Sequence, residues 1–520
     1  MLRVAVVGAG PKGLHAIAAL LRGSWRGKDL RVDCFDANPP GQGAAYACGQ
    51  PDWLRLNVHP RVLHLPPHPP LDEWLAARGT DPSGDVPRHE VGRYLRAAAD
   101  GLRREAGETL AFHPHAVRAL ERRGDAWLVR HDGGSVLADE VLLATGHAPD
   151  HDHALRHAWR PAPGVRMVPG VYPVADSLSQ AQVPAGSVVA VRGAALTFID
   201  CVLALTEGRP RDEWPRRILP VSRSGALLLA KPAVPMRADL AELLARHAAQ
   251  LPGLLADAAA PFEAATRATR AAAAELLTSQ GQAHQEAVAA VDAALTTGFD
   301  PDLAPQGRAR AALQRSILLA EQDHASSPSW ALGRAWAALY APMVAGLAHR
   351  SPETVEWRRF SAASAVLERF TYGPPLPNAR RLEALICQHD GPHASCTAPV
   401  CLEWLERGVG IAEGITGVGD DERPDVVVDA VLPPPGAQTA RTPLVDALMV
   451  DGWVRTAMPR RGLEVTPHAQ CVGRDGSLTP GLSAIGRLTE DVVIGHDTLS
   501  VRMHDEIERW AARLASELEA

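Results

Sequence analysis

Short apolar runs and longer amphipathic runs alternate at the start of the chain, and this pattern predicts β–α units. Residues 2–7 (LRVAVV) are almost wholly apolar, as in a strand buried on both faces, and residues 13–22 carry apolar positions at helical spacing. A second apolar strand begins at residue 30 and ends at Asp36. The pattern restarts at 187–191 (SVVAV), which is followed by another helical run. We therefore expect an α/β fold with two Rossmann-like domains.

The pattern changes between residues 236 and 350, where Ala, Leu, Glu, Arg and Gln dominate. The stretches 238–251 and 261–277 have the periodicity of amphipathic helices. We interpret 236–350 as a mainly helical insertion. It is a candidate lid over a substrate cavity and a candidate homodimer interface, and plain structural packing is the alternative.

Three further segments complete the predicted domains. Two alternating runs flank Asp132-Gly133-Gly134, which indicates a hairpin, and a strand after them ends at Thr145-Gly146. Residues 425–432 (DVVVDAVL) predict another buried strand, and 481–515 predict a short strand, a glycine turn and a closing helix. These segments assign 1–150 with 433–520 to the first domain and 183–235 with 351–432 to the second.

Length and composition narrow the class of protein. A chain of 520 residues with 46% hydrophobic residues is expected to hold more than one domain, and its net charge of −7 gives no reason to expect nucleic-acid binding. No apolar stretch has the length of a membrane span. The first strand starts at once, without a signal-like segment, so we expect an unprocessed cytoplasmic protein. The seven cysteines are too few and scattered for a disulfide framework.

The glycines between the first strand and the first helix predict a dinucleotide site. In this pattern Gly8 allows the tight turn, Gly10 lets the backbone approach a pyrophosphate, and Gly13 lets helix and strand pack closely. The helix N-terminus adds N–H groups and a partial positive charge. Asp36, at the tip of the second strand, is placed for ribose hydroxyls and would repel a 2′-phosphate. This site is therefore expected to take FAD or NAD.

The second turn departs from the pattern at two positions. Gly193 is present, but Ala195 and Phe198 stand where the close-approach and packing glycines are usual. Phosphate binding is expected to be weakened, and Phe198 is expected to push helix and strand apart or to point elsewhere. Arg223 follows the next strand and suits a 2′-phosphate, which favours NADPH over NADH. The alternative is that this arginine is solvated surface.

Several short segments resemble a family of FAD/NAD(P)-binding flavoproteins that is distantly similar to flavin-containing and N-hydroxylating monooxygenases. They are GAGPKGL (8–14), GQGAAY (41–46), LRLNVHP (54–60), VGRYLR (91–96), LLATG (142–146), VRGAALTFID (191–200), ERFTYGPP (368–375) and IGHDTLSVRMHDEIERWA (494–511). The resemblance implies a two-dinucleotide-binding flavoprotein architecture. No named motif covers the helical insertion.

The resemblance also implies roles for single residues. It places the FAD pyrophosphate on Gly8, Gly10 and Gly13, the adenosine ribose on Asp36, the flavin or its ribityl chain near Asn57, the passing cofactor at Thr145 and Gly146, and the nicotinamide cofactor on Gly193, Thr197 and Arg223. Such proteins commonly carry a Gly-Asp pair near the C-terminus whose Asp contacts the ribityl chain. This chain has Gly486-Arg487 there, which leaves that contact unassigned, although the Gly486 backbone could still serve.

The reaction that the resemblance favours is an NADPH-dependent monooxygenation of a small molecule. NADPH would reduce FAD, O2 would give a flavin C4a-hydroperoxide, and an amine or a similar nucleophile would be oxygenated. One alternative is a flavin dehydrogenase, reductase or oxidase that inserts no oxygen. A second is a non-enzymatic FAD-binding redox sensor or assembly protein, which the departures at Ala195 and Phe198 would suit.

Two clusters of reactive side chains stay without a firm role. The loop 387–401 holds Cys387, His389, His393, Cys396 and Cys401. Their spacing matches no standard zinc pattern, so we expect incidental cysteines and no metal site. His496-Asp497 and His504-Asp505 could relay protons, or could be surface and capping residues, and His147 is equally open. If 499–513 is a helix, His504 lies in its second turn. No catalytic residue is assigned.

Overall fold

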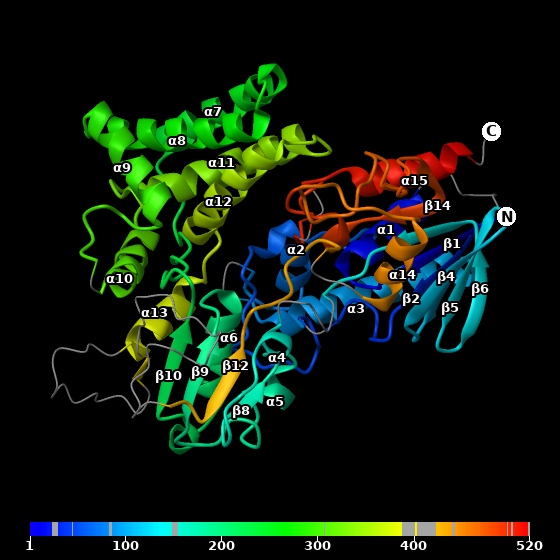
Figure 1. The fold of residues 1–520 in the computed structure, drawn as a ribbon, viewed down its shortest axis with the longest axis horizontal. Helices are drawn as coiled ribbons and strands as arrows, with labels where there is room; N and C mark the ends of the chain where they lie inside the picture. Colours follow the sequence, from blue (N-terminus) through cyan, green and yellow to red (C-terminus); the bar gives the residue numbers. More distant parts are fainter. Residues whose placement is uncertain are drawn as a thin grey trace. The chain divides into compact units, whose positions relative to one another are not determined.

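The computed structural model describes two compact units of the chain. The described residues are 1–22, 30–43, 45–82, 86–147, 154–305, 307–386, 401–402, 423–438, 442–496, 498–500 and 503–517. Unit 1 comprises Met1–His153, Leu347–Ser351 and Pro433–Ala520, and unit 2 comprises Ala154–Gly346 and Pro352–Leu432. Each unit contains its own sheet (Figure 1).

The sheet of unit 1 is parallel except at one edge. Its strands run in the order β13-β14-β7-β1-β2-β3, and only β13 pairs antiparallel to its neighbour β14. The bounds are β1 (Leu2–Val7), β2 (Leu30–Phe35), β3 (Leu110–His113), β7 (Glu140–Leu143), β13 (Gln470–Val472) and β14 (Leu478–Ala484). The four residues of β7 are all buried, as expected for a parallel strand covered on both faces.

Helices and a small second sheet cover the two faces of this sheet. The helices are α1 (Pro11–Arg22), α2 (Leu71–Ala76), α3 (Arg88–Ala106), α14 (Pro443–Asp451) and α15 (Glu506–Glu517), and the antiparallel meander is β4 (Val117–Arg123), β5 (Ala126–His131) and β6 (Gly134–Ala138). One core cluster joins the sheet to α1, α3 and α15, and a second joins it to the meander and α14. The hairpin predicted at Asp132-Gly133-Gly134 is confirmed between β5 and β6.

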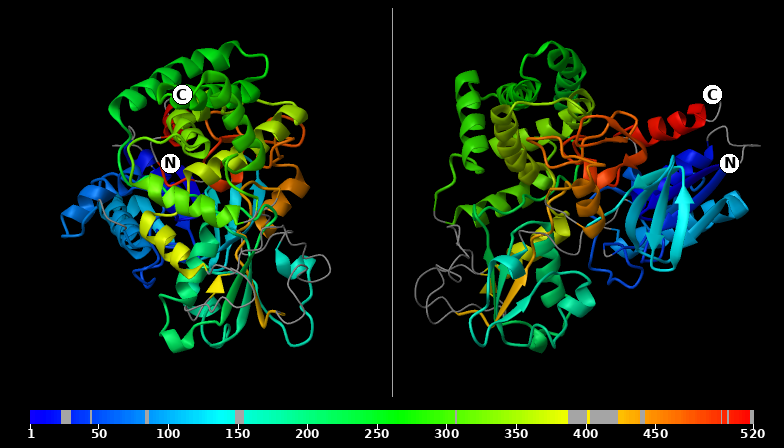
Figure 2. Two further views of the ribbon diagram at one scale, coloured as in Figure 1. Left: turned by 90° about the vertical axis from the view of Figure 1, so that its left-hand side faces the viewer. Right: turned by 45° about the vertical axis from the view of Figure 1, so that its right-hand side comes forward.

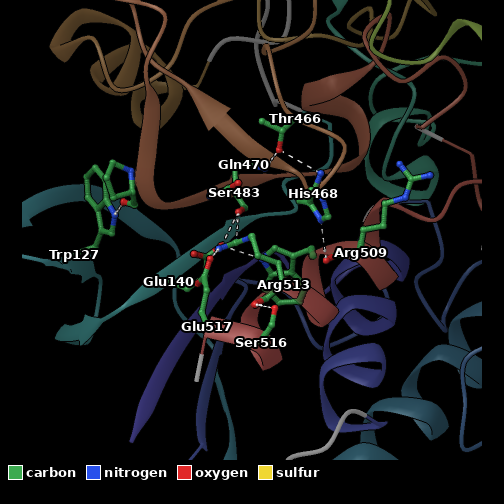
Figure 3. A network of polar contacts seen from close by, with 12 residues as sticks. Trp127, Glu140, Thr466, His468, Gln470, Ser483, Arg509, Arg513, Ser516 and Glu517 are labelled. Carbon is green, nitrogen blue, oxygen red and sulfur yellow. Dashed lines mark hydrogen bonds and ion pairs between the residues drawn. The ribbon is translucent and has the colours of Figure 1, made fainter. Parts of the chain in front are cut away.

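A buried carboxylate ties the C-terminal helix of unit 1 to its sheet. Glu140 in β7 is only 2% exposed and accepts hydrogen bonds from Ser483 Oγ (2.6 Å), Trp510 Nε1 (2.9 Å) and Arg513 Nη2 (2.7 Å). Figure 3 shows Ser483 and Arg513 converging on it from separate segments. Burial raises the pKa of Glu140, which the Arg513 charge opposes. The network therefore fixes α15 across β7 and β14.

Unit 2 has a smaller, wholly parallel sheet in the order β11-β10-β9-β12-β8. Its strands are β8 (Arg166–Val168), β9 (Val188–Arg192), β10 (Arg217–Val221), β11 (Cys401–Leu402) and β12 (Val426–Asp429). Short helices α4 (Leu155–Ala158) and α5 (Val174–Ser177) and the longer α6 (Leu196–Leu205) accompany it. The strands predicted at 187–191 and 425–432 are thus present as β9 and β12, one beside the other.

The remaining helices of unit 2 gather at the end of the unit away from the sheet (Figures 1 and 2). They are α7 (Ala238–Asp257), α8 (Pro261–Ser279), α9 (His284–Thr297), α10 (Arg308–Ala320), α11 (Pro328–Leu347) and α12 (Thr354–Thr371), while α13 (Leu376–Leu385) packs on α6 and α10. The helices predicted over 238–251 and 261–277 are confirmed as parts of α7 and α8. Within the described residues, no helix is long and apolar enough to cross a membrane.

The closing helix predicted within 481–515 is present as α15, but it begins at Glu506 rather than near residue 499. His504 therefore lies in the chain before the helix rather than in its second turn. Its Nε2 contacts the Ile494 carbonyl oxygen at 2.9 Å, a long-range bond that local periodicity cannot reveal.

Candidate functional site

Two glycines of the first turn are required by the protein itself. The Gly8 N–H donates to the Phe35 carbonyl at 2.8 Å, which joins the turn to the end of β2. Gly8 has φ +111°, and a Cβ there would lie 2.4 Å from the Ala144 oxygen. A Cβ on Gly13 would lie 1.9 Å from the Gly8 oxygen. Side chains at these positions would collide with backbone, as the motif predicts.

Gly10 differs, because a Cβ built there meets no heavy atom within 4 Å. Nothing in the described chain requires a glycine at this position. The open space lies at the N-terminus of α1, where N–H groups without helical partners and the helix dipole favour an anion. The turn thus leaves room for a phosphate group at the position that the sequence motif assigns to the pyrophosphate.

Asp36 follows β2 and holds the glycine turn in shape. Its Oδ2 accepts from the Ala9 N–H at 2.9 Å, and its Oδ1 accepts from the Asn38 N–H at 2.8 Å. An ionised carboxylate has about four acceptor sites. It can therefore keep both backbone contacts and still accept from ribose hydroxyls, so the predicted ribose role is compatible with this geometry.

The end of β7 places a polar side chain beside the same turn. The Ala144 N–H donates to the Val7 oxygen at 2.9 Å, and the following Thr145 hydroxyl is buried without a hydrogen-bond partner among the described residues. Gly146 has open space at its Cβ position. Asn57 is half-buried in a bend of the segment before α2. An unsatisfied buried hydroxyl is costly, which fits a partner that the protein chain does not supply.

Gly486 lies against the first turn of α1. It has φ +72°, and a Cβ there would be 3.7 Å from Lys12 Cγ. Its N–H donates to His496 Nδ1 at 3.2 Å. Arg487 turns away to donate to the Pro433 carbonyl at 2.7 Å. Segments far apart in sequence, 8–13 and 486–496, thus meet at one place in unit 1.

Two glycines that the sequence reasoning left without roles support this turn. The Gly41 N–H donates to the Ala9 oxygen at 2.7 Å, and Gly41 adopts φ +82° against Leu95 of α3. A Cβ on Gly92 would lie 1.9 Å from the Tyr46 oxygen. Both glycines stand in segments, 41–46 and 91–96, that carried the family resemblance, and this was the signal available for them.

The second turn repeats the backbone of the first. The Gly193 N–H donates to the Val221 oxygen at 2.8 Å, and Gly193 has φ +104°. Ala195 is exposed, and Thr197 is buried near the start of α6. Phe198 is 0% exposed, so the second of the predicted alternatives holds: the ring points into the core of unit 2.

Two serine hydroxyls and Arg223 follow the end of β10, and a second arginine reaches them from α12. Arg223 is exposed between Ser222 and Ser224, whose Oγ atoms accept from the Gly225 and Ala226 N–H groups. Arg369 of α12, which the sequence reasoning did not name, donates to Ser224 Oγ at 3.3 Å. Burial lowers the pKa of Arg369, and no carboxylate pairs with it among the described residues. Arg369 stands in the segment 368–375, which was the available signal.

The predicted cysteine and histidine loop lies almost wholly outside the described residues. Cys387, His389, His393 and Cys396 lie outside the described residues, as does Asp497, and Cys401 begins β11. Across the described ranges, no group of three or more His, Cys, Asp or Glu is placed to hold a metal ion. His147 follows Gly146 directly and is exposed.

With this geometry in place, comparison with known proteins tests the assignment. Residues 5–148 match a protein-family model described as FAD-NAD(P)-binding. This part of the chain is similar to FAD-NAD(P)-binding domains. The match spans β1, the glycine turn, α1, Asp36 and the end of β7. A search of curated proteins found no match.

Solved structures resemble the chain over its whole length. The reduced form of ornithine hydroxylase from Pseudomonas aeruginosa is 12% identical, covers 99% of each chain and has a TM-score of 0.51. L-lysine 6-monooxygenase from Pseudomonas syringae is 16% identical, covers 99% of this chain and 98% of its own, and has a TM-score of 0.48. At 12% identity the likeness to the ornithine hydroxylase supports the fold alone, which is the two-dinucleotide-binding flavoprotein architecture.

Proposed function

We propose that the protein is an FAD-dependent, NADPH-consuming monooxygenase that acts on an amine or a similar nucleophile of a small molecule. The open space at Gly10, near the start of the segment 5–148 that matches the FAD-NAD(P)-binding family model, carries the cofactor part of the proposal. The reaction type is supported by solved proteins of this architecture, among them a lysine monooxygenase and an ornithine hydroxylase.

In unit 1, FAD would be held largely by backbone. The Gly8–Gly13 turn and the α1 N-terminus would take the pyrophosphate. Asp36 would accept from the adenosine ribose while keeping its bond to the Ala9 N–H. The buried Thr145 hydroxyl supplies a further polar group toward the cofactor.

In unit 2, NADPH would lie on the Gly193 turn. Arg223 and the half-buried Arg369 offer positive charge at the tip of β10, where a 2′-phosphate is expected. Guanidinium groups suit phosphate because their N–H donors match its oxygens. Thr197 and the backbone near Ala195 would contact the pyrophosphate.

The chemistry would come from the cofactors and the positioning from the chain. When bound, FAD would accept a hydride from NADPH and activate O2, so that one oxygen atom goes to the substrate nitrogen and the other leaves as water. The side chains around the turn orient the cofactor and keep bulk water from its buried parts.

A spectral and turnover assay tests the proposal. We expect a yellow protein whose flavin is bleached by NADPH under anaerobic conditions. In air, NADPH and O2 should be consumed in equal amounts once an accepted amine is present, and the product should gain the mass of one oxygen atom. Little hydrogen peroxide should be released.

Other outcomes point to the two alternatives. Flavin reduction by NADPH with one H2O2 per NADPH, or with no oxygenated product from any amine tested, would indicate a reductase or oxidase. A flavin that NADPH never reduces would indicate an FAD-binding sensor or assembly protein. A protein that does not take up FAD at all would overturn the cofactor assignment.

Three further expectations remain proposals. The helices from α7 to α11 are a candidate lid or homodimer interface, and Leu254 and Leu318 are exposed apolar side chains on them. Light scattering on the purified protein would measure the oligomeric state. The domain boundaries and the cytoplasmic location also stay predictions from the sequence.

A further inference from the structure

A buried histidine beside Gly486 has a donor that nothing in the described chain uses. His496 is 1% exposed, and its Nδ1 accepts from the Gly486 N–H at 3.2 Å and lies 2.8 Å from Thr489 Oγ1. Because Nδ1 acts as an acceptor, the hydrogen-bond pattern assigns the proton of the neutral ring to Nε2. Nε2 is fully buried and has no partner among the described residues.

A neighbouring histidine has the complementary group. His504 Nε2 lies 2.9 Å from the Ile494 carbonyl oxygen, an acceptor only, so Nε2 carries the proton and Nδ1 is the acceptor. That Nδ1 is also buried without a partner in the described chain. The two rings lie side by side, with centroids 5.0 Å apart and planes tilted by 47°. One unused donor and one unused acceptor thus belong to adjacent rings.

The surroundings keep both rings neutral at neutral pH. Burial is the main cause that lowers the pKa of His496 and of His504, and the Lys12 charge lowers both further. His15 of α1 and His349 also act on His496, while Asp505 and Glu506 act in the opposite sense on His504. A neutral pair retains one donor and one acceptor, whereas protonation would leave only donors.

The pair adjoins the glycine turn of unit 1. Gly486, whose N–H His496 holds, lies next to Lys12 in the first turn of α1, two residues after Gly10. The two rings are thus connected through Gly486 to the turn where the ligand is expected. A hydroxyl is the group whose single oxygen accepts from one ring and donates to the other.

We propose that His496 Nε2–H and His504 Nδ1 together bind one hydroxyl of the ribityl chain of FAD. This pair would supply the side-chain contact that Gly486-Arg487 does not, since Arg487 is engaged at Pro433. The inference rests on the FAD part of the proposed function and is independent of the reaction that the protein catalyses.

Asn and Gln substitutions can remove each unpaired ring atom while keeping the hydrogen bond that the same side chain makes to the backbone. In His496→Asn the amide oxygen can take the place of Nδ1 and keep the Gly486 N–H, while the Nε2 donor is lost. In His504→Gln the amide NH2 can take the place of Nε2 and keep the Ile494 carbonyl, while the Nδ1 acceptor is lost. His496→Gln is the control that retains a donor near the Nε2 position.

The measurement is the dissociation constant of FAD. Flavin-free apoprotein is titrated with FAD, and binding is followed by the quenching of flavin fluorescence. FAD analogues lacking the 2′-, 3′- or 4′-hydroxyl of the ribityl chain are compared with FAD itself. We expect His496→Asn and His504→Gln each to weaken FAD binding about five- to tenfold, the range of one hydrogen bond. We expect His496→Gln to weaken it less.

The coupling between side chain and hydroxyl decides the outcome. One deoxy analogue should bind the unaltered protein about five- to tenfold more weakly than FAD does. Its affinity for either variant should be no lower than its affinity for the unaltered protein, because the hydroxyl that the two rings bind is already absent. Equal losses for FAD and all analogues, or no loss in either variant, would overturn the proposal and leave the two atoms to water or to packing. FAD binding that follows the expected pattern without NADPH-dependent oxygenation would overturn the proposed reaction and leave this inference standing.

Discussion

The turn after β1 and the turn after β9 have nearly the same backbone and different side chains. Each first glycine has a positive φ, +111° at Gly8 and +104° at Gly193, and each donates its N–H at 2.8 Å to the end of the neighbouring strand. The third and sixth positions differ. Gly10 and Gly13 in unit 1 correspond to Ala195 and Phe198 in unit 2.

This difference shows that the glycines of the motif answer different requirements. Gly13 is needed because a Cβ at this position would lie 1.9 Å from the Gly8 oxygen. At the corresponding position in unit 2, the chain buries the whole phenyl ring of Phe198. Gly10 is needed by nothing in the described chain, which leaves the ligand as the reason for it. The pyrophosphate is thus expected to approach the backbone more closely in unit 1 than in unit 2. We therefore expect tight binding of FAD and weaker binding of NADPH.

The largest effect is expected from Gly13→Ala. The new Cβ would collide with a backbone oxygen that cannot swing aside, so unit 1 should lose about 5 kcal/mol or more of stability and fail to hold FAD. Urea unfolding followed by circular dichroism, with flavin content, measures this. Gly253→Ala in α7, where the Cβ position is open, is the matched control and should change little. A stable, yellow Gly13→Ala protein would contradict the packing argument.

Phe198→Ala tests the same position in unit 2. Removing a fully buried ring leaves a cavity, so the free energy of unfolding should fall by about 3 to 5 kcal/mol. Flavin content should be retained in whatever protein folds, because the predicted FAD contacts lie in unit 1. A substitution that costs less than about 1 kcal/mol would mean that the ring is not packed in the core as described.

Gly10→Ala separates ligand from fold. The Cβ has open space, so stability should stay within about 0.5 kcal/mol, while FAD affinity should fall at least about thirtyfold, or ~2 kcal/mol, through contact with the pyrophosphate. Thermal unfolding of the apoprotein and FAD titration give the two numbers. Equal affinity for FAD in the variant would show that the pyrophosphate does not approach this backbone.

Acid should affect unit 1 before unit 2. The described histidines with lowered pKa values all lie in unit 1: His59, His131, His147, His496 and His504. For His496 the folded state prefers the neutral ring, so the unfolded state binds more protons below about pH 6.5. Its stabilising contribution is complete above that pH and declines below it, by up to about 1.4 kcal/mol per pH unit.

Urea unfolding between pH 7.5 and 5.5 checks this sign. The unaltered protein should lose stability as the pH falls, and His496→Asn, which has no titrating ring, should lose less over the same range. Identical pH dependence in the two proteins would mean that His496 is protonated, or accessible to water, in the folded state.

The smallest effect concerns the tips of β2 and β10, where an acid in one unit corresponds to arginines in the other. Arg369→Gln should raise the KM for NADPH about fivefold, or ~1 kcal/mol, and leave the KM for NADH unchanged, since NADH has no 2′-phosphate. Steady-state assays with both nucleotides measure the ratio. Arg380→Gln on α13 removes an exposed arginine that pairs with Glu321 and serves as the control. An equal change for both nucleotides would assign Arg369 a structural role.

Local patterns predicted most of the fold because their causes are local. The glycine turns, the hairpin at Asp132-Gly133-Gly134 and the helices near 238 and 261 follow from turn chemistry and apolar periodicity. The start of α15 and the buried position of Phe198 were not predictable in this way. Both depend on contacts with segments far along the chain, such as the bonds that α15 makes to Glu140.

The sequence by itself determined that the chain has two glycine-turn units, an acid at Asp36 and a helical region after the second unit. These are properties of single segments, and each has its signal within some thirty residues. Only the tertiary structure decided which glycines the protein needs and which the ligand needs, because that depends on what stands within 4 Å of each Cβ position. Only the tertiary structure also showed that His496 and His504 lie near the first glycine turn. Residues 10 and 486 are far apart in sequence, and it is tertiary packing, not a local sequence pattern, that brings them together.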